Sequence, residues 1–227
     1  MFVPDIHSVP LRASGAFGDM MLVDDGGVQV GVWSAQPGEL VGTTGDYDEV
    51  MLMVGGRVTV RHDDGEYDLA PGVLWSTPRH WRGDWAVHRE VRKMYVIDHR
   101  AGEASSPAYL SNAHTAELGA ATRRPTVLDG DPHERSLTLW SHNRIETGVW
   151  DCTPGTFPFR RDGYDEVFCV LAGHATVAFD SGMSFDMHPG AMLVTTSGST
   201  GTWTVHETVR KAFVIVHDRQ PRRAPAD

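Results

Sequence analysis

The sequence has few of the features that mark extracellular, membrane or nucleic-acid-binding proteins. Its 227 residues include only two cysteines, Cys152 and Cys169, which is too few for a disulfide framework and favours a reducing, cytoplasmic location. The net charge of −10 offers no overall basic character to attract nucleic acid or an anionic membrane. No apolar run approaches the ~20 residues that span a bilayer, and residues 1–10 lack the basic and apolar regions of a signal peptide. We therefore expect neither nucleic acid nor membrane as a partner.

What the chain does have is apolar and turn-forming residues arranged as short strands. Hydrophobic residues make up 41% of it, and many of the 24 glycines and 13 prolines separate strand-length segments such as the apolar run 50–54 and the alternating segment 57–62. Turn signals at this spacing are typical of an all-β sandwich or barrel. No segment keeps a 3.6-residue period over three turns, although a short helix could lie around Thr115 to Ala121.

The chain also repeats itself. Three motifs occur twice, 117 or 118 residues apart: Gly31-Val32-Trp33 with Gly148-Val149-Trp150, Tyr47-Asp48-Glu49-Val50 with Tyr164-Asp165-Glu166-Val167, and Val91-Arg92-Lys93 with Val209-Arg210-Lys211. Such self-similarity indicates a duplicated domain. We expect an N-terminal domain over residues 1–105 and a C-terminal domain over residues 106–227. The second should begin with a linker rich in Ala, Ser, Gly and Thr and end in a mobile tail.

The order of these motifs resembles that of the cupin family. A Tyr-Asp-Glu motif opens an apolar strand that ends in glycine, and a Pro-Gly turn and a last strand with Val-Arg-Lys follow. Two copies resemble a bicupin, and Gly-Val-Trp with Gly-x-Trp is similar to the branch that includes ethanolamine-utilization and ureidoglycine aminohydrolase-like cupins. The resemblance covers residues 20–98 and 137–217. It implies an all-β protein of two tandem cupin domains, each a double-stranded β-helix (jelly roll).

A typical cupin binds a divalent metal through His-x-His, a glutamate and a later histidine. By the resemblance, Glu49 and Glu166 stand at the glutamate position. The other positions carry no histidine: Thr43, Gly45 and Gly83 in the first copy, and Arg160, Asp162 and Gly201 in the second. One carboxylate cannot hold a transition metal tightly, and His80 turned toward Glu49 would still leave too few ligands. We therefore predict no tightly bound metal and no other cofactor.

Residues kept in both copies are then the candidates for catalysis: Tyr47, Glu49 and Lys93 in the first, and Tyr164, Glu166 and Lys211 in the second. Because side chains alternate along a strand, Tyr47, Glu49 and Met51 should share one face. If that face lines the barrel, the glutamate could act as general acid or base, with the lysine as electrostatic partner or Schiff-base amine. The plainer interpretation is a structural salt bridge, and the pattern leaves open whether Arg or Lys of each Arg-Lys pair faces inward.

Aromatic and basic side chains near the barrel mouths are candidates for substrate binding: Trp81, Trp85 and His80 in the first copy, and Arg160 and Trp203 in the second. The tryptophans are equally consistent with core residues. Aromatic and cationic residues alternate over residues 75–85, as on a lip that grips an anionic, partly apolar molecule. Motif spacing slightly favours the second copy as the working barrel.

Three functions are consistent with the sequence. The first is a metal-independent lyase, isomerase or aminohydrolase that performs acid–base chemistry on a small polar metabolite. The second is a module that binds or senses a small ligand without catalysis, and the third is a metal-dependent enzyme with an unusual ligand set. Two linked cupins resemble the dimer that single cupins form, so a monomer is self-sufficient and a homodimer stays open.

Overall fold

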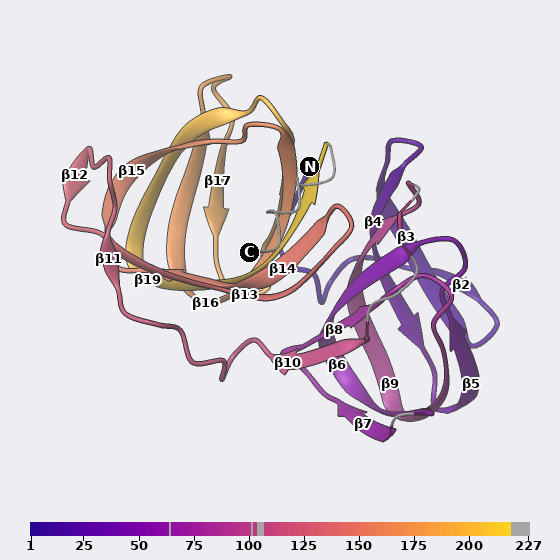
Figure 1. Cartoon of the computed structure of the whole chain (residues 1–227). Coiled ribbons are helices and arrows are strands. Elements are labelled where there is room, and N and C mark those ends of the chain that lie inside the picture. Colours follow the sequence, from indigo (N-terminus) through magenta and orange to yellow (C-terminus); the bar gives the residue numbers. More distant parts are fainter. Residues whose placement is uncertain (64, 101, 104–106, 219–227) are drawn as a thin grey trace.

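The chain forms two curled β-sheets side by side in the computed structural model, which describes residues 1–63, 65–100, 102–103 and 107–218 (Figure 1). The described residues form strands and turns but no helix, so the all-β prediction is confirmed. The short helix expected around residues 115–121 is wrong, because a turn over residues 113–115 leads there into irregular chain. None of the described residues belongs to a helix capable of crossing a membrane.

Each sheet closes into a barrel. The first contains β2 (Arg12–Ser14), β3 (Phe17–Asp24), β4 (Val28–Ala35), β5 (Gly38–Thr43), β6 (Asp48–His62), β7 (Gly65–Leu69), β8 (Val73–Thr77), β9 (Arg82–Asp98) and β10 (Tyr109–Asn112). The second contains β1 (Phe2–Val3), β11 (Thr122–Arg123), β12 (Asp129–Gly130), β13 (His133–His142), β14 (Ile145–Cys152), β15 (Gly155–Arg160), β16 (Tyr164–Phe179), β17 (Ser184–Met187), β18 (Met192–Thr195) and β19 (Thr200–His217). All strand pairs are antiparallel, and the order β8-β6-β9-β4-β3 recurs as β18-β16-β19-β14-β13.

The N-terminal strand joins the barrel of the other half. β1 pairs with β18 in the second barrel, whereas β10, which follows the first copy of the repeat, pairs back onto β8. The domain boundary predicted between residues 105 and 106 lies outside the described residues, as do residues 219–227 of the tail. The two short pairings tie the N-terminal segment and the linker to the barrels.

One long bent strand replaces two predicted short ones in each barrel. β6 continues through Gly55-Gly56, where the sequence predicts a break, and its register with β9 shifts there. Gly56 has φ +83°, and a Cβ on it would overlap the backbone of Glu90. β16 bends in the same way at Gly173, with φ +80°. A glycine bulge lets the strand turn a corner while pairing continues, which is how one sheet closes into a barrel.

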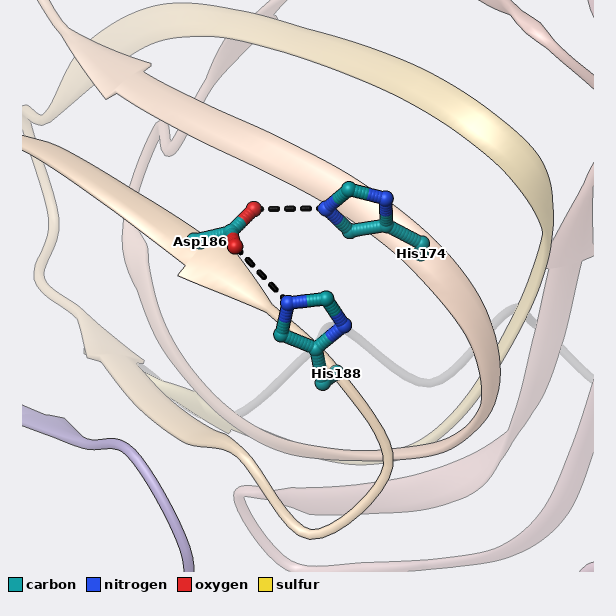
Figure 2. A group of neighbouring side chains, drawn as sticks. All are labelled: His174, Asp186 and His188. Carbon is teal, nitrogen blue, oxygen red and sulfur yellow. Dashed lines mark hydrogen bonds and ion pairs between the residues drawn. The ribbon is translucent and has the colours of Figure 1, made fainter.

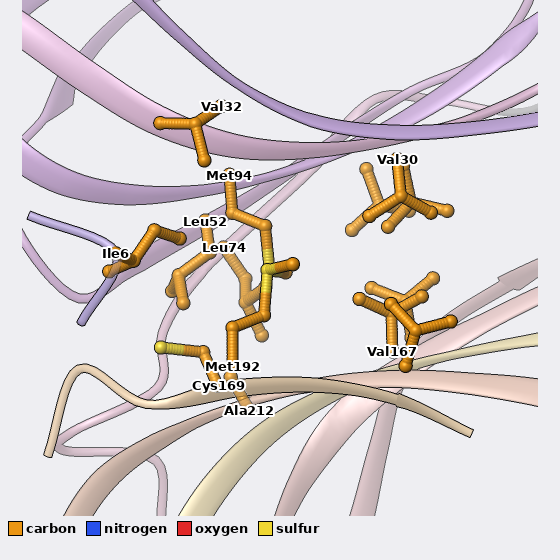
Figure 3. Close-up of a cluster of buried hydrophobic side chains, with 14 of the residues drawn as sticks. Ile6, Val30, Val32, Leu52, Leu74, Met94, Val167, Cys169, Met192 and Ala212 are labelled. Carbon is orange, nitrogen blue, oxygen red and sulfur yellow. The ribbon is translucent and has the colours of Figure 1, made fainter. Parts of the chain in front are cut away.

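The apolar runs of β6 and β16 are continuous because both faces of these strands are buried. Met51 and Met53 belong to the core inside the first barrel, whereas Val50 and Leu52 point the other way into a cluster shared by the two barrels. There they meet residues of the second barrel such as Val167, Cys169 and Met192 (Figure 3). Each of these strands therefore contributes to two cores, the one inside its own barrel and the one between the two barrels.

The same alternation decides which member of each Arg-Lys pair faces inward. Lys93 and Lys211 point into the barrels, and the arginines point out. Arg92 donates hydrogen bonds to the carbonyls of Ile6 and Val9 in the N-terminal segment. Arg210 donates to the carbonyls of Ala113 and Ala116 in the linker, at 2.8 and 2.6 Å. The outward arginines thus fasten the two connecting segments, and the lysines are left for the barrel interiors.

Candidate functional site

Each barrel contains a cavity, which we call the first cup and the second cup. The first cup has a volume of about 500 Å³, within the ~300–1,000 Å³ range typical of small-molecule sites. The second has about 160 Å³. Tyr47, Glu49, Trp81, Trp85 and Lys93 line the first cup, together with residues that include Asp19, Trp33, Thr44, Met51 and Tyr95. Tyr164, Glu166, Trp203 and Lys211 line the second, together with residues that include Arg124, Trp150, Phe157, Phe159, Arg161 and Phe213.

An ion pair lies on the wall of the first cup. Lys93 Nζ on β9 is 2.7 Å from Glu49 Oε1 on β6 and 2.9 Å from the sulfur of Met51. The ammonium also lies over the rings of Trp33 and Trp85, at 5.0 and 5.5 Å from their centroids. Such cation–π contacts hold the charge in place. In the described part of the chain, Lys93 is the one cation within ion-pair distance of Glu49, which leaves its Oε2 available to a ligand.

Two tyrosines and a second carboxylate complete the polar wall of the first cup. Tyr95 donates a hydrogen bond to Asp19 Oδ1 at 3.2 Å, and Tyr47 donates to the carbonyl of Thr43 at 3.1 Å. Burial, followed by the charge of Glu49, raises the pKa of Tyr47, and burial and Asp19 raise the pKa of Tyr95. Both phenols therefore stay protonated and act as hydrogen-bond donors rather than bases.

In the second cup the glutamate is held by two cations. Lys211 Nζ lies 2.6 Å from Glu166 Oε1, and Arg161 forms an ion pair with Oε2. Arg161 also donates to Thr195 Oγ1 at 3.0 Å. Burial alone would raise the pKa of Glu166, but the charges of Lys211 and Arg161 outweigh it and lower the pKa. Burial among aromatic rings lowers the pKa of Lys211 to about 8, against the opposing charge of Glu166.

The duplication explains why the two cups differ in volume. The register of β5 with β9 and of β15 with β19 matches Leu40 to Phe157 and Gly42 to Phe159. Two residues further along each copy, Thr44 corresponds to Arg161. Larger side chains at three matched positions therefore fill the second cup. In the first, Gly42 leaves space that the indole of Trp85 occupies, because a Cβ there would overlap its Nε1.

The cups also differ in charge. The first is lined by the carboxylates of Asp19 and Glu49 and by one cation, Lys93. The second is lined by one carboxylate, Glu166, and three cations, of which Arg124 is itself paired with Glu134. Asp19 in the first barrel corresponds to Ser136 in the second, since both lie opposite the repeated tryptophan, Trp33 or Trp150. The copies thus keep the Glu-Lys pair but surround it with opposite charge.

Two residues predicted to bind substrate do not line the cups. His80, with φ 63°, points outward and lies 3.4 Å from the exposed Asp46. Arg160 is the outward residue at the end of β15 and lies 3.8 Å from Asp162, whereas its neighbour Arg161 turns inward. The cationic lip over residues 75–85 is not formed either, because the buried Arg79 is neutralised by Asp48 at 3.2 Å. In the second copy, the alternation of side chains along the strand thus moves the inward arginine by one residue, from Arg160 to Arg161.

The donor groups of the cups do not fit a divalent metal. Among the described residues, no imidazole lines either cup. The ammonium of Lys93 lies beside Glu49 Oε1, where it would repel a metal ion, and both oxygens of Glu166 are held by cations. Neither cup brings together, from the residues that the structure describes, three His, Cys, Asp or Glu side chains, the donors that hold a transition metal.

A compositional signal points to the same residues. The chain has 20 lysines and arginines, and only two of these are lysines, Lys93 and Lys211. A compact ammonium stands at the matched position of each barrel, and arginine serves everywhere else. The repeated Gly-Val-Trp motif likewise supplies Trp33 and Trp150, whose rings form cation–π contacts with the lysine ammonium of their own barrel. Arg161, Asp19 and Tyr95 lack such a repeated signal, because the copies differ at these positions.

Comparisons with known proteins agree with this architecture. A family model described as an EutQ-like cupin domain matches the chain twice, over residues 22–95 and 141–213. A search of curated proteins found no match. A protein of unknown function of the DUF861 family from Pseudomonas syringae pv. tomato superimposes with a TM-score of 0.75 at 20% identity, covering 88% of this chain and 86% of that one.

Two further solved structures share the fold. A cupin 2 conserved barrel domain protein from Leptotrichia buccalis has a TM-score of 0.71 at 10% identity and covers 95% of this chain and 96% of its own. A mutant of Bacillus subtilis oxalate decarboxylase has a TM-score of 0.61 at 11% identity, covering 97% of this chain and 78% of that one. Some structural neighbours are therefore enzymes, and at such identities the likeness shows the fold alone. Two tandem cupin barrels are confirmed.

Proposed function

Because the chain belongs to the family of EutQ-like cupin domains, we propose that it is an enzyme whose first cup performs acid–base chemistry on a small polar metabolite without a metal in the cup. The reaction class is that of a lyase, isomerase or aminohydrolase. The observation that carries the proposal is the Glu49–Lys93 ion pair of 2.7 Å on the wall of a 500 Å³ cavity. The second cup, with 160 Å³ and a doubly paired Glu166, supports a structural role for that barrel.

The first cup favours a ligand with both an apolar face and hydrogen-bond donors. Trp81, Trp85 and Trp33 provide flat apolar walls, and the carboxylates of Asp19 and Glu49 accept hydrogen bonds. Two carboxylates against one ammonium leave a negative balance, which favours an amine or another cationic or neutral donor group over an anion. This differs from the anionic ligand that the sequence of residues 75–85 suggests, because Arg79 is already neutralised.

In the proposed reaction, Glu49 Oε2 takes a proton from an acidic C–H, N–H or O–H of the bound metabolite. The ammonium of Lys93 holds Oε1 and stabilises negative charge that develops on the substrate. Tyr47 and Tyr95 stay protonated, with their O–H groups donated to Thr43 and Asp19, and their hydroxyl oxygens orient the substrate by accepting hydrogen bonds from it. The proton on Glu49 then returns to a different atom of the substrate in an isomerisation, or to the leaving group in a lyase step. In a hydrolytic step Glu49 instead takes the proton from a water molecule as its oxygen attacks the substrate, and passes that proton to the leaving amine.

The test begins with a thermal-shift screen of small amines, ureido compounds and carboxylic acids, followed by turnover assays of each stabilising compound. Glu49→Gln should lower turnover by at least ~100-fold, as expected for loss of a general base, with a smaller change in binding. Glu39→Gln, an exposed glutamate on β5, is the matched control and should leave turnover intact. Prior treatment with a chelator should also leave turnover intact.

Retention of the Glu-Lys pair in both copies is equally compatible with a binding or sensing protein, and the same experiment separates that function from catalysis. If a compound binds in the first cup and Glu49→Gln changes only its affinity, with no conversion by the wild-type protein, the protein binds without catalysis. Turnover that disappears on chelation and returns with added metal contradicts the metal-independent mechanism when the returning metal is found inside the first cup.

A further inference from the structure

A cluster of two histidines and one aspartate lies on the outer face of the second barrel. His174 belongs to β16, Asp186 to β17, and His188 follows β17 directly. None of the three lines either cup. Because Ala175 pairs with Met187 and Thr176 with Asp186, the antiparallel register places His174 opposite His188 and all three side chains on one face of the hairpin. Figure 2 shows both imidazoles turned toward the carboxylate.

The three side chains are close enough to hold one ion. Asp186 Oδ1 is 2.6 Å from His174 Nε2, and Oδ2 is 2.7 Å from His188 Nε2. The two imidazole rings stack with centroids 4.3 Å apart, and one potential donor atom from each residue lies within 4.8 Å of the others. Metal–nitrogen and metal–oxygen bonds of ~2.0–2.2 Å separate tetrahedral donors by roughly 3.3 Å. Small rotations of the exposed Asp186 and His188 and the half-buried His174 therefore reach that geometry.

The first barrel provides an internal reference for this cluster. There Thr59 pairs with Asp68, as Thr176 pairs with Asp186, and the threonine hydroxyl contacts a histidine in both barrels: His88 at 2.8 Å and His206 at 2.9 Å. The residues that differ are the partners of the aspartate. Arg57 and Ala70 of the first barrel stand where the second has His174 and His188, and Arg57 pairs with Asp68 at 2.8 Å. The second copy thus has imidazoles where the first has a guanidinium and a methyl group.

We propose that His174, Asp186 and His188 form a binding site for a divalent transition-metal ion, of which Zn²⁺, Ni²⁺ and Co²⁺ are the fitting kinds. Two imidazoles and one carboxylate suit these borderline ions, whereas Mg²⁺ and Ca²⁺ prefer sets made of oxygen alone. The ion takes the place of the protons through which the two Nε2 atoms now bond Asp186; in each neutral ring that proton moves to Nδ1, and water fills the remaining positions of the ion. His206, whose ring lies 4.6 Å from that of His174, packs beside the site and limits rotation of His174.

The site differs from the metal site implied by the cupin resemblance, because it lies outside the cups and joins β16 to the end of β17. A bound ion would cross-link this hairpin to the turn that precedes β18. Its presence is independent of the proposed function of the first cup. Failure of either proposal therefore leaves the other standing.

The test uses the full chain without a histidine tag, freed of metal by chelation, at about pH 7.5, where most imidazoles are neutral. Titration with ZnCl₂ in a calorimeter should give one ion per chain, and CoCl₂ should give the visible absorption of a nitrogen-ligated ion. The paired substitution His174→Arg and His188→Ala, which copies the first barrel, should weaken Zn²⁺ binding by ~100-fold or more, beyond the loss typical of outer-shell changes. Asp186→Asn should weaken it in the same direction.

Two control variants make the result specific. His80→Asn removes an exposed histidine that also faces an aspartate, and asparagine tolerates the positive φ at this position; it should bind Zn²⁺ like the wild-type protein. Arg57→His with Ala70→His should add a second site in the first barrel. The proposal is overturned if no stoichiometric Zn²⁺ binding is measured, or if binding survives the His174→Arg and His188→Ala pair unchanged.

Discussion

The matched substitutions Glu166→Gln and Glu49→Gln should destabilise the protein to different extents. Glu166 is buried with two cations, Lys211 and Arg161, whose side chains are 7% and 9% exposed. Removing its charge leaves both cations buried without a counter-charge. Removing the charge of Glu49 leaves one cation, Lys93, which lies on the wall of a 500 Å³ cavity where water can solvate it.

Breaking a buried ion pair from one side costs ~3–5 kcal/mol, and losing a charged hydrogen bond beside water costs roughly 1–3 kcal/mol. We therefore expect Glu166→Gln to lower the free energy of unfolding by about 2 kcal/mol more than Glu49→Gln does. In a chain of this size, each 1 kcal/mol corresponds to a shift in Tm of ~2–4 °C. Adding Arg161→Met to Glu166→Gln removes one of the stranded cations and should recover part of the loss.

Thermal and urea unfolding of the variants at pH 7 measure these differences. Because the folded-state pKa of Glu166 is lowered, its stabilising charge is fully present above its unfolded pKa of ~4.3 and is lost as the pH falls through the lower folded value. The gap between wild type and Glu166→Gln should therefore narrow in acid. Equal losses for the two glutamine variants, or a gap that does not depend on pH, would refute the reasoning.

Three further predictions follow from the two cups. With only two lysines in the chain, ¹⁵N-lysine labelling should give two side-chain signals, and the signal that Lys211→Arg removes should titrate near pH 8 in the folded protein. Because Lys211 in the unfolded chain keeps its proton up to a pKa of ~10.4, its contribution to the free energy of unfolding rises with pH between about 8 and 10.4. Titration of this signal only above about pH 10 would contradict the argument from burial. Gly42→Phe, which copies Phe159, should displace Trp85, lower stability by ~1–3 kcal/mol and abolish binding in the first cup, whereas unaltered binding would show that the ligand lies elsewhere. Formaldehyde, a small neutral aldehyde, with cyanoborohydride should methylate Lys93 and the N-terminal amine in preference to Lys211, as peptide mass spectrometry would show, and preferential labelling of Lys211 would indicate that the second cup is the accessible one.

The fold could be predicted from the sequence because the repeat and the strand pattern are long-range signals that single side chains do not alter. The same repeat marks Glu49 with Arg92-Lys93 and Glu166 with Arg210-Lys211 as candidates, but only the structure shows that the lysines form the ion pairs. The parts that the sequence leaves open depend on a shift of one residue. Such a shift puts Arg161 rather than Arg160 in the second cup.

The volumes of the two cups could not be predicted from the repeated motifs either. The second copy keeps the motif spacing better, yet its cup is the smaller one, because Phe157, Phe159 and Arg161 replace Leu40, Gly42 and Thr44. These positions lie between the repeated motifs, where the copies differ. The cluster of His174, Asp186 and His188 was missed for a related reason: the copies differ at both histidine positions, where the first copy has Arg57 and Ala70, and the two histidines come together only across a hairpin.

The most direct measurement of the central claim is a crystal structure of the protein soaked with a compound from the thermal-shift screen, collected with anomalous scattering to locate metals. We expect density for the compound in the first cup, against Glu49 and Lys93, and no metal in either cup. A Mn, Fe, Ni or Zn ion bound inside a cup by three or more protein donors would contradict this expectation, as would a compound seated in the second cup alone.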